Sequence, residues 1–136
     1  MDVISMKTVD MDASKRVAEL VCAQVGRCVS NVVRAFLYFR DALPENIMYV
    51  EGLWTVGGQT DIHVWIESDE AIIDPTLIAL HPRNWNSYKR SIPIKRLGEQ
   101  EVIKRYEGQS IEPGVRLDLI LEWPDVEAVR KVFDPP

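Results

Sequence analysis

The sequence has few cysteines, few histidines and no long hydrophobic run, and each shortage excludes a class of protein. Its 136 residues include two cysteines and two histidines. Cys22 and Cys28 match no zinc-knuckle spacing, and we expect both to be reduced thiols in a cytoplasmic protein. No apolar run reaches the roughly 18 residues of a membrane span, so no membrane partner is expected. The acidic N-terminus also lacks the basic and apolar regions of a signal peptide.

Basic residues are outnumbered, with 16 Lys and Arg against 21 Asp and Glu, which gives a net charge of −5. Because phosphate binding needs a basic face, nucleic acid is not an expected partner. The length and the 46% hydrophobic content are those of one globular domain. We therefore expect residues 1–136 to form a single domain, with residues 1–11 flexible. The oligomeric state stays open.

Helical and alternating hydrophobic patterns both occur, which predicts an α+β fold. Apolar residues recur at helical spacing over roughly 13–25, where Asp12 is the expected cap, and again from Cys28 to about Arg40. Strand patterns cover 47–54, 61–67, 70–74 and 115–122. Further helices are predicted over 98–107 and from 124 onward, and a long loop over 77–95.

The most specific chemical pattern is a histidine and an aspartate on two consecutive predicted strands. If Ser68-Asp69 is a two-residue loop, His63 lies directly opposite Asp74. A four-residue loop places Asp74 opposite Trp65, diagonal to His63 on the same face, and a three-residue loop separates the pair. An aspartate beside a histidine fixes the tautomer of the ring and stabilises its charged form. A purely structural His–Asp hydrogen bond is the alternative.

Cys28 begins the second predicted helix, directly after Gly26 and Arg27. A thiol in a first helical turn lies at the positive end of the helix dipole, beside free backbone N–H groups, and both favour the nucleophilic thiolate. The alternative is a buried, inert cysteine. Cys22, beside Val21 in the middle of the preceding predicted helix, is expected in the core.

Four short motifs in this region occur in a recognisable order. They are Cys-x-x-Asn at 28–31, Tyr-Val-Glu-Gly at 49–52, His-x-Trp at 63–65 and Asp-Pro-Thr at 74–76. In this order they resemble the transglutaminase-like branch of the papain-like cysteine hydrolase superfamily, over residues 24–77. The resemblance implies a helix headed by a cysteine and packed on a small antiparallel β-sheet, with the catalytic core in these residues.

Carried onto this sequence, the resemblance implies that Cys28 is the nucleophile, His63 the general base and acid, and Asp74 the orienting carboxylate. The backbone N–H of Cys28 would form part of the oxyanion hole. The supporting residues would be Asn31, which braces the helix, Glu51 and Trp65, which line the floor of the site, and Gln24, upstream of the thiol.

The sequence shows no run of carboxylates typical of a calcium site, so a small hydrolase or acyl transferase acting on an amide or ester, without a cofactor, is expected. Two other functions remain open at this stage. One is a binding or scaffold module that keeps the fold without turnover. The other is a metal site built from Cys28, His63, Asp74 and His81.

Overall fold

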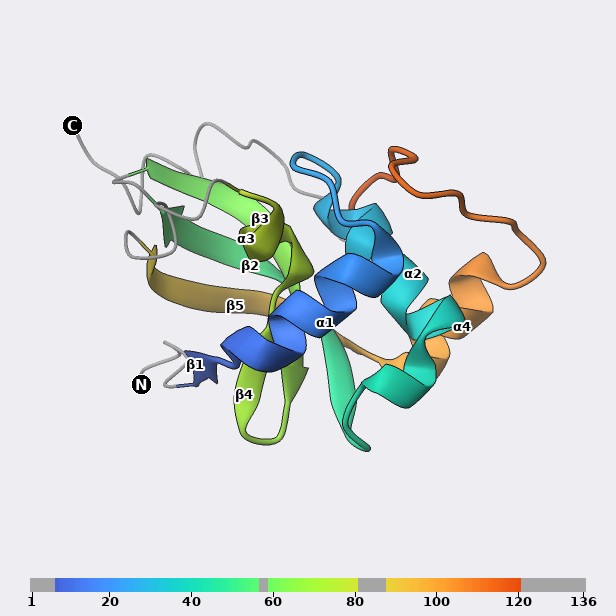
Figure 1. Ribbon diagram of the computed structural model, residues 1–136, viewed down its shortest axis with the longest axis horizontal. Helices are drawn as coiled ribbons and strands as arrows, with labels where there is room; N and C mark the ends of the chain where they lie inside the picture. Colours follow the sequence, from blue (N-terminus) through green and yellow to red (C-terminus); the bar gives the residue numbers. More distant parts are fainter. Residues whose placement is uncertain (1–6, 57–58, 81–87, 121–136) are drawn as a thin grey trace.

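The computed structural model describes residues 7–56, 59–80 and 88–120, and within them the chain has an α+β architecture. The elements are β1 (Thr8–Val9), α1 (Met11–Val21), α2 (Cys28–Tyr38), a 3-10 turn (Arg40–Ala42), β2 (Ile47–Val56), β3 (Gln59–Ser68), β4 (Ala71–Ile73), α3 (Pro75–Ala79), β5 (Tyr88–Gly98) and α4 (Glu99–Tyr106). The strands form one five-stranded sheet in the order β1-β4-β3-β2-β5 (Figure 1). The predicted α+β class is confirmed, and a cysteine does head the second helix.

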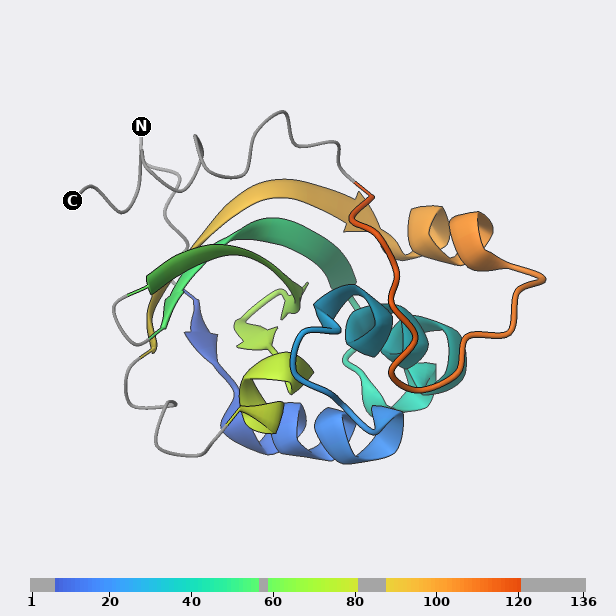
Figure 2. The same ribbon diagram turned by 90° about the horizontal axis from the view of Figure 1, so that it is seen from above.

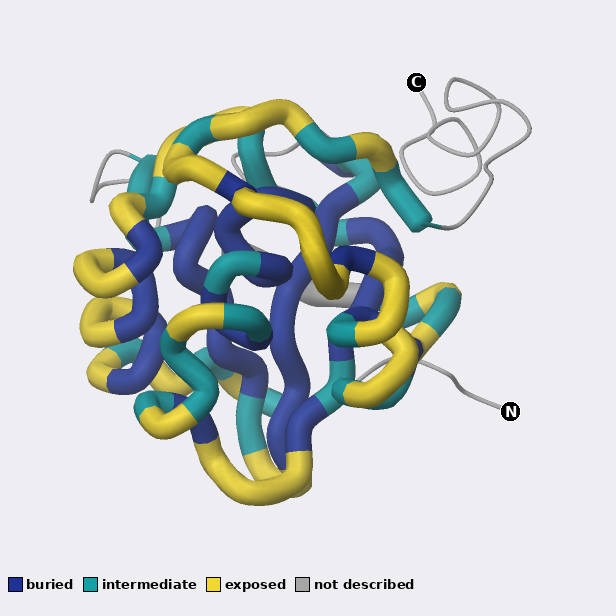
Figure 3. The backbone as a smooth tube through the Cα atoms, turned by 90° about the vertical axis from the view of Figure 1, so that its right-hand side faces the viewer, coloured by how far each residue is buried: buried dark blue, intermediate teal, exposed yellow. Residues whose placement is uncertain are grey.

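The sheet curves over the helices. Figure 2 shows β2, β3 and β5 arching together, with α1, α2 and α3 on the concave side. Val32, Val33 and Phe36 of α2 pack in one buried cluster with Val64 and Ile66 of β3. Figure 3 shows the same division in the backbone, with strands buried and the outer turns of the helices exposed. The helical apolar stripe predicted for α2 therefore faces the sheet.

The N-terminal part differs from the prediction in three ways. Within the residues expected to be flexible, β1 pairs in parallel with β4, which makes the sheet mixed rather than purely antiparallel. Asp10, not Asp12, caps α1 by accepting the N–H of Ala13 at 3.0 Å. The helix ends at Val21, and Cys22 follows in a left-handed conformation with φ 56°, exposed rather than in the core.

The β3–β4 hairpin takes the second of the two compatible registers. Glu67 pairs with Ile72 and Ile66 with Ile73, so Asp74 comes after the last paired residue on the face that His63 occupies. The Ser68 hydroxyl sets this register, because it accepts the N–H groups of Glu70 and Ala71 and donates to the carbonyl of Ala71. The strand predicted over 70–74 is thus shorter, and Pro75 begins α3.

The C-terminal part contains a strand that was not predicted, β5, and the strand predicted over 115–122 does not form in its described residues. The predicted 77–95 loop contains the end of α3 and most of β5, an edge strand that pairs antiparallel with β2 across a bulge at Glu51/Gly52, opposite Pro93. The helix predicted over 98–107 is confirmed as α4. Residues 115–120 are irregular instead of forming a strand. The helix predicted from 124 lies outside the described residues.

Candidate active site

Cys28 is the first residue of α2, and the residue before it leaves the helix start without a side-chain cap. Asp10 and Asp74 cap α1 and α3 by accepting backbone N–H groups. Arg27 precedes α2 and makes no such bond, since a guanidinium has no acceptor. The N–H groups in the first turn of α2 therefore receive no acceptor from the cap residue. Beside the Cys28 thiol, they can stabilise an anionic oxygen.

His63 and Asp74 form a buried pair next to this thiol. Nε2 of His63 lies 2.9 Å from Oδ2 and 3.2 Å from Oδ1 of Asp74. The His63 side chain is 3% exposed and that of Asp74 is 1% exposed. Because Nε2 is held by the carboxylate, Nδ1 is the ring nitrogen left to interact with Cys28, whose side chain is among the groups that raise the pKa of the ring.

The charge of His63 is stabilised by this arrangement. Burial opposes the charged ring and would lower its pKa. The carboxylate of Asp74, its hydrogen bond to the ring and the contact with Cys28 together outweigh burial and raise the pKa of His63 to about 9. The ring is therefore an imidazolium at neutral pH, which is the partner that a thiolate needs.

Two further contacts fix Asp74 so that its carboxylate faces the histidine. Its own N–H donates to the Oγ of Ser14 on α1 at 2.9 Å. Its Oδ1 accepts the N–H of Leu77 at 3.1 Å, which also caps α3. The carboxylate thus caps α3 and holds the imidazole of His63 at the same time. Ser14 was not predicted, because its contact depends on how α1 packs against α3.

Aromatic rings enclose the histidine. Trp54 of β2 stacks on His63 with ring centroids 3.4 Å apart and planes 8° apart, and the Trp65 ring centroid lies 6.0 Å away. Gly52 pairs with His63, and a Cβ at Gly52 would lie 2.7 Å from the Trp65 ring and 2.3 Å from the carbonyl oxygen of Ile92. Gly52, the glycine of the Tyr-Val-Glu-Gly motif, is therefore required on β2, because any side chain there would clash with β5 and Trp65.

Trp65 lies on the face of His63, as expected, but Trp54 was missed. The signal was available in Gly57-Gly58, a turn sequence that favours a two-residue hairpin loop. Such a loop pairs Val56 with Gln59, as observed, and hence Trp54 with Asp61, diagonal to His63.

Glu51 does not share the face of Trp65, which corrects the expectation that both line one floor. It pairs with Val64, whereas Trp65 pairs with Val50. Fully buried, Glu51 accepts the hydroxyl of Tyr49 at 2.7 Å and the N–H of Ile120 at 2.6 Å. Burial and the neighbouring Glu51 raise the pKa of Tyr49, and Cys28 adds to this rise. Glu51 therefore anchors the backbone at Ile120 from the face of β2 opposite to that of Trp65.

Asn31 braces the start of α2, as predicted. Its side chain accepts the N–H of Gln24 at 3.2 Å and donates to the carbonyl of Gln24 at 3.0 Å. It also donates to the hydroxyl of Thr76 at 2.8 Å. The side chain of Gln24 lies against Gly114, where a Cβ would be 2.5 Å from its Nε2. The Gln24 backbone thus has a structural role in holding the loop before Cys28.

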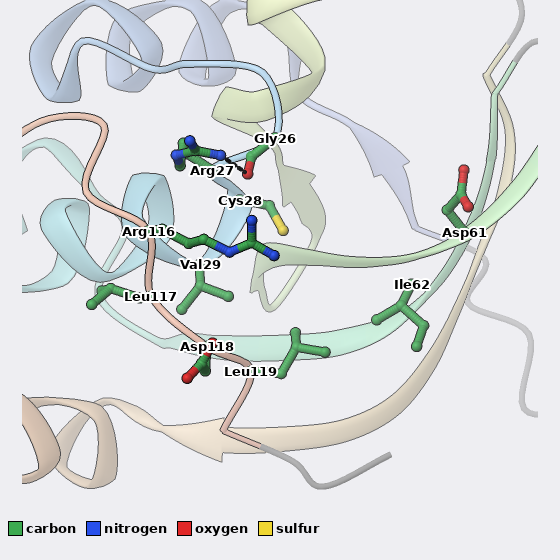
Figure 4. A pocket seen from close by; sticks show the side chains of 10 residues that line it. All are labelled: Gly26, Arg27, Cys28, Val29, Asp61, Ile62, Arg116, Leu117, Asp118 and Leu119. Atoms are coloured by element: carbon green, nitrogen blue, oxygen red, sulfur yellow. Dashed lines mark hydrogen bonds between the residues drawn. The ribbon is translucent and has the colours of Figure 1, made fainter. Parts of the chain in front are cut away.

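The thiol opens into a pocket of about 620 Å³, here called the Cys28 pocket. It is lined by Gly26, Arg27, Cys28, Val29, Asp61, Ile62, Arg116, Leu117, Asp118 and Leu119. Figure 4 shows the Cys28 sulfur directed toward β3, the strand that carries Asp61 and Ile62. His63 is buried and does not line the pocket, whereas Cys28 does.

The described part of the chain contains no group of three or more His, Cys, Asp or Glu side chains able to hold a metal ion. His81, the fourth ligand of the possible metal site, lies outside the described residues. No helix within the described ranges is long and apolar enough to cross a membrane.

Comparisons with known proteins add no relative. Scans against protein-family models, curated proteins and solved structures each found no significant match. The functional argument therefore depends on the geometry of the site.

Proposed function

We propose that the protein is a cysteine-dependent amide or ester hydrolase or acyl transferase, with a papain/transglutaminase-like core and Cys28, His63 and Asp74 as its triad. One observation carries the proposal. A thiol at an uncapped helix start opens into a pocket and lies against an imidazole that a buried carboxylate keeps charged.

Acylation in this site follows from the positions of the groups. The Cys28 sulfur attacks the carbonyl carbon of the substrate, and the carbonyl oxygen takes up the electron pair. Backbone N–H groups in the first turn of α2 stabilise that oxyanion. The His63 imidazolium gives its proton to the leaving amine or alcohol, the bond to the leaving group breaks, and an acyl thioester on Cys28 remains.

Deacylation reverses the proton transfer. His63, now neutral, takes a proton from water or from an acceptor amine as that nucleophile attacks the thioester. The sulfur leaves as a thiolate, and the thiolate–imidazolium pair is restored. Asp74 stays hydrogen-bonded to Nε2 throughout, which keeps Nδ1 directed at the reacting atoms.

An activated ester tests this proposal without knowledge of the natural substrate. We expect p-nitrophenyl acetate to release a burst of p-nitrophenolate and to leave an acetyl group on Cys28, detected by mass spectrometry of peptides. Cys28→Ser and His63→Ala should abolish the burst, and Cys22→Ser should leave it unchanged. Equal acetylation of Cys22 and Cys28, or no adduct on the native protein, would contradict the proposal and favour a binding module.

A further inference from the structure

The Cys28 pocket carries two arginines, and they are used differently. Arg27 donates to the carbonyls of Gly114 at 3.1 Å and Gly26 at 3.0 Å, so its guanidinium is engaged by the backbone. Arg116 also lines the pocket, and within the described ranges its guanidinium makes no hydrogen bond or ion pair. Figure 4 shows its side chain extended across the pocket toward Cys28.

The segment that carries Arg116 is tied down on both sides of it. Ile111 at its start donates its N–H to the hydroxyl of Tyr38 at 3.0 Å, and Gly114 accepts from Arg27. At its end, the N–H of Ile120 donates to Glu51 at 2.6 Å. Arg116 is thus presented over the pocket by backbone contacts that do not use its own side chain.

The acidic residues of the pocket do not neutralise this position. Figure 4 places Asp61 at the far end of the pocket from the thiol. Figure 4 also draws the Asp118 carboxylate on the side of the pocket away from the thiol, and the guanidinium of Arg116 beside the Cys28 sulfur.

We propose that Arg116 is a specificity-determining residue, and that the site prefers acyl substrates with a carboxylate close to the reacting carbonyl. A guanidinium pairs with a carboxylate through two parallel hydrogen bonds, which both attracts and orients such a group. The inference rests on the proposed thiol chemistry, because it assigns the substrate class of the same site.

Two alkylating reagents separate this inference from the proposed function. The thiolate sulfur bonds to the CH₂ carbon of iodoacetate or iodoacetamide and displaces iodide, which adds a carboxymethyl or a carbamoylmethyl group; only iodoacetate carries a carboxylate. The measurement is the ratio of their rate constants at Cys28 in the native protein, read by peptide mass spectrometry. The same ratio at Cys22 is an internal reference.

We expect iodoacetate to be favoured at Cys28 relative to Cys22. Arg116→Gln should lower that preference about fivefold, equivalent to about 1 kcal/mol, with the iodoacetamide rate unchanged. Arg116→Lys should retain part of the preference. Lys104→Gln, which removes the same charge from an exposed site on α4 outside the pocket, should have no effect. Added salt should weaken the preference in the wild type more than in Arg116→Gln.

An unchanged ratio in Arg116→Gln, with Cys28 still reacting in a His63-dependent way, overturns the role of Arg116 and leaves the proposed function intact. An equal fall in both rates also overturns it, because Arg116 would then act on the thiol rather than on the reagent. If Cys28 is inert to both reagents until the protein unfolds, the proposed function fails and this inference fails with it.

Discussion

The two cysteines lie at opposite ends of neighbouring helices, and their surroundings differ accordingly. Cys22 ends α1 in a left-handed conformation and is exposed. Cys28 begins α2, is half-buried and contacts a charged imidazole. Backbone carbonyls converge where a helix ends, and N–H groups converge where it begins. Position on the helix and the neighbouring His63–Asp74 pair, rather than the residue type, therefore make one thiol a candidate nucleophile.

If the His63–Asp74 ion pair distinguishes the surroundings of Cys28 from those of Cys22, the stability of the folded protein should depend on the charge of His63. The pKa of His63 is about 9 in the folded protein against 6.5 for the ordinary group. Because the folded value is the higher one, the pair's contribution is fully present below pH 6.5, declines up to pH 9 and is absent above it. The expected loss is about 3 kcal/mol, measured by urea denaturation across this range.

The matched control for this pH dependence is Asp74→Asn. An asparagine can still accept the N–H of Leu77 and cap α3, but it removes the charge that holds the imidazolium. In this variant the decline in stability between pH 6.5 and 9 should disappear. Equal slopes for wild type and variant would mean that the pair does not stabilise the folded protein.

The loop between the two cysteines should depend on Asn31. Its side chain is 1% exposed and makes three hydrogen bonds, two to Gln24 and one to Thr76. Asn31→Ala leaves the backbone N–H and C=O of Gln24 without their side-chain partner. We therefore expect a loss of about 2 kcal/mol in the free energy of unfolding, together with slower alkylation of Cys28. Thr76→Val, which removes one of these bonds, should cost about half as much. A loss no larger than that of Thr76→Val would refute the bracing role.

The smallest expected effect concerns the other cysteine. Cys22 has a φ of 56°, a conformation that glycine adopts without strain. Cys22→Gly should therefore stabilise the protein by about 0.5–1 kcal/mol, with the reactivity of Cys28 unchanged. Cys22→Ala is the matched control, since it removes the thiol and keeps the Cβ. Equal thermal unfolding midpoints for the two variants would show that the conformation at this helix end carries no strain.

The sequence predicted the parts of the site that depend on local periodicity. The alternation of β3 placed His63 and Trp65 on one face, and the glycine and helical stripe around Cys28 located the start of α2. The hairpin register was left between two choices, because the Ser68 hydroxyl that decides it bonds to backbone atoms of the turn itself.

Contacts between distant segments were beyond sequence reasoning. The alternation in 115–122 suggested a strand, but its described part, residues 115–120, is irregular and is held at its two ends by Arg27, which bonds to Gly114, and by Glu51, which bonds to Ile120. β5 was missed because Pro93 interrupts its pattern, which an edge strand tolerates at a bulge. Arg116 therefore had no signal in the sequence, since its place over the thiol depends on these long-range anchors.

The most direct test of the central claim is alkylation of the native protein with iodoacetamide across pH, comparing wild type with His63→Ala at both cysteines. The account predicts that wild-type Cys28 reacts rapidly below neutral pH and that loss of His63 slows it about 100-fold. Cys22, which is exposed, should react equally in both proteins and serves as the internal reference for the reagent. A Cys28 rate that is the same with and without His63, or that rises only on unfolding, would contradict the account.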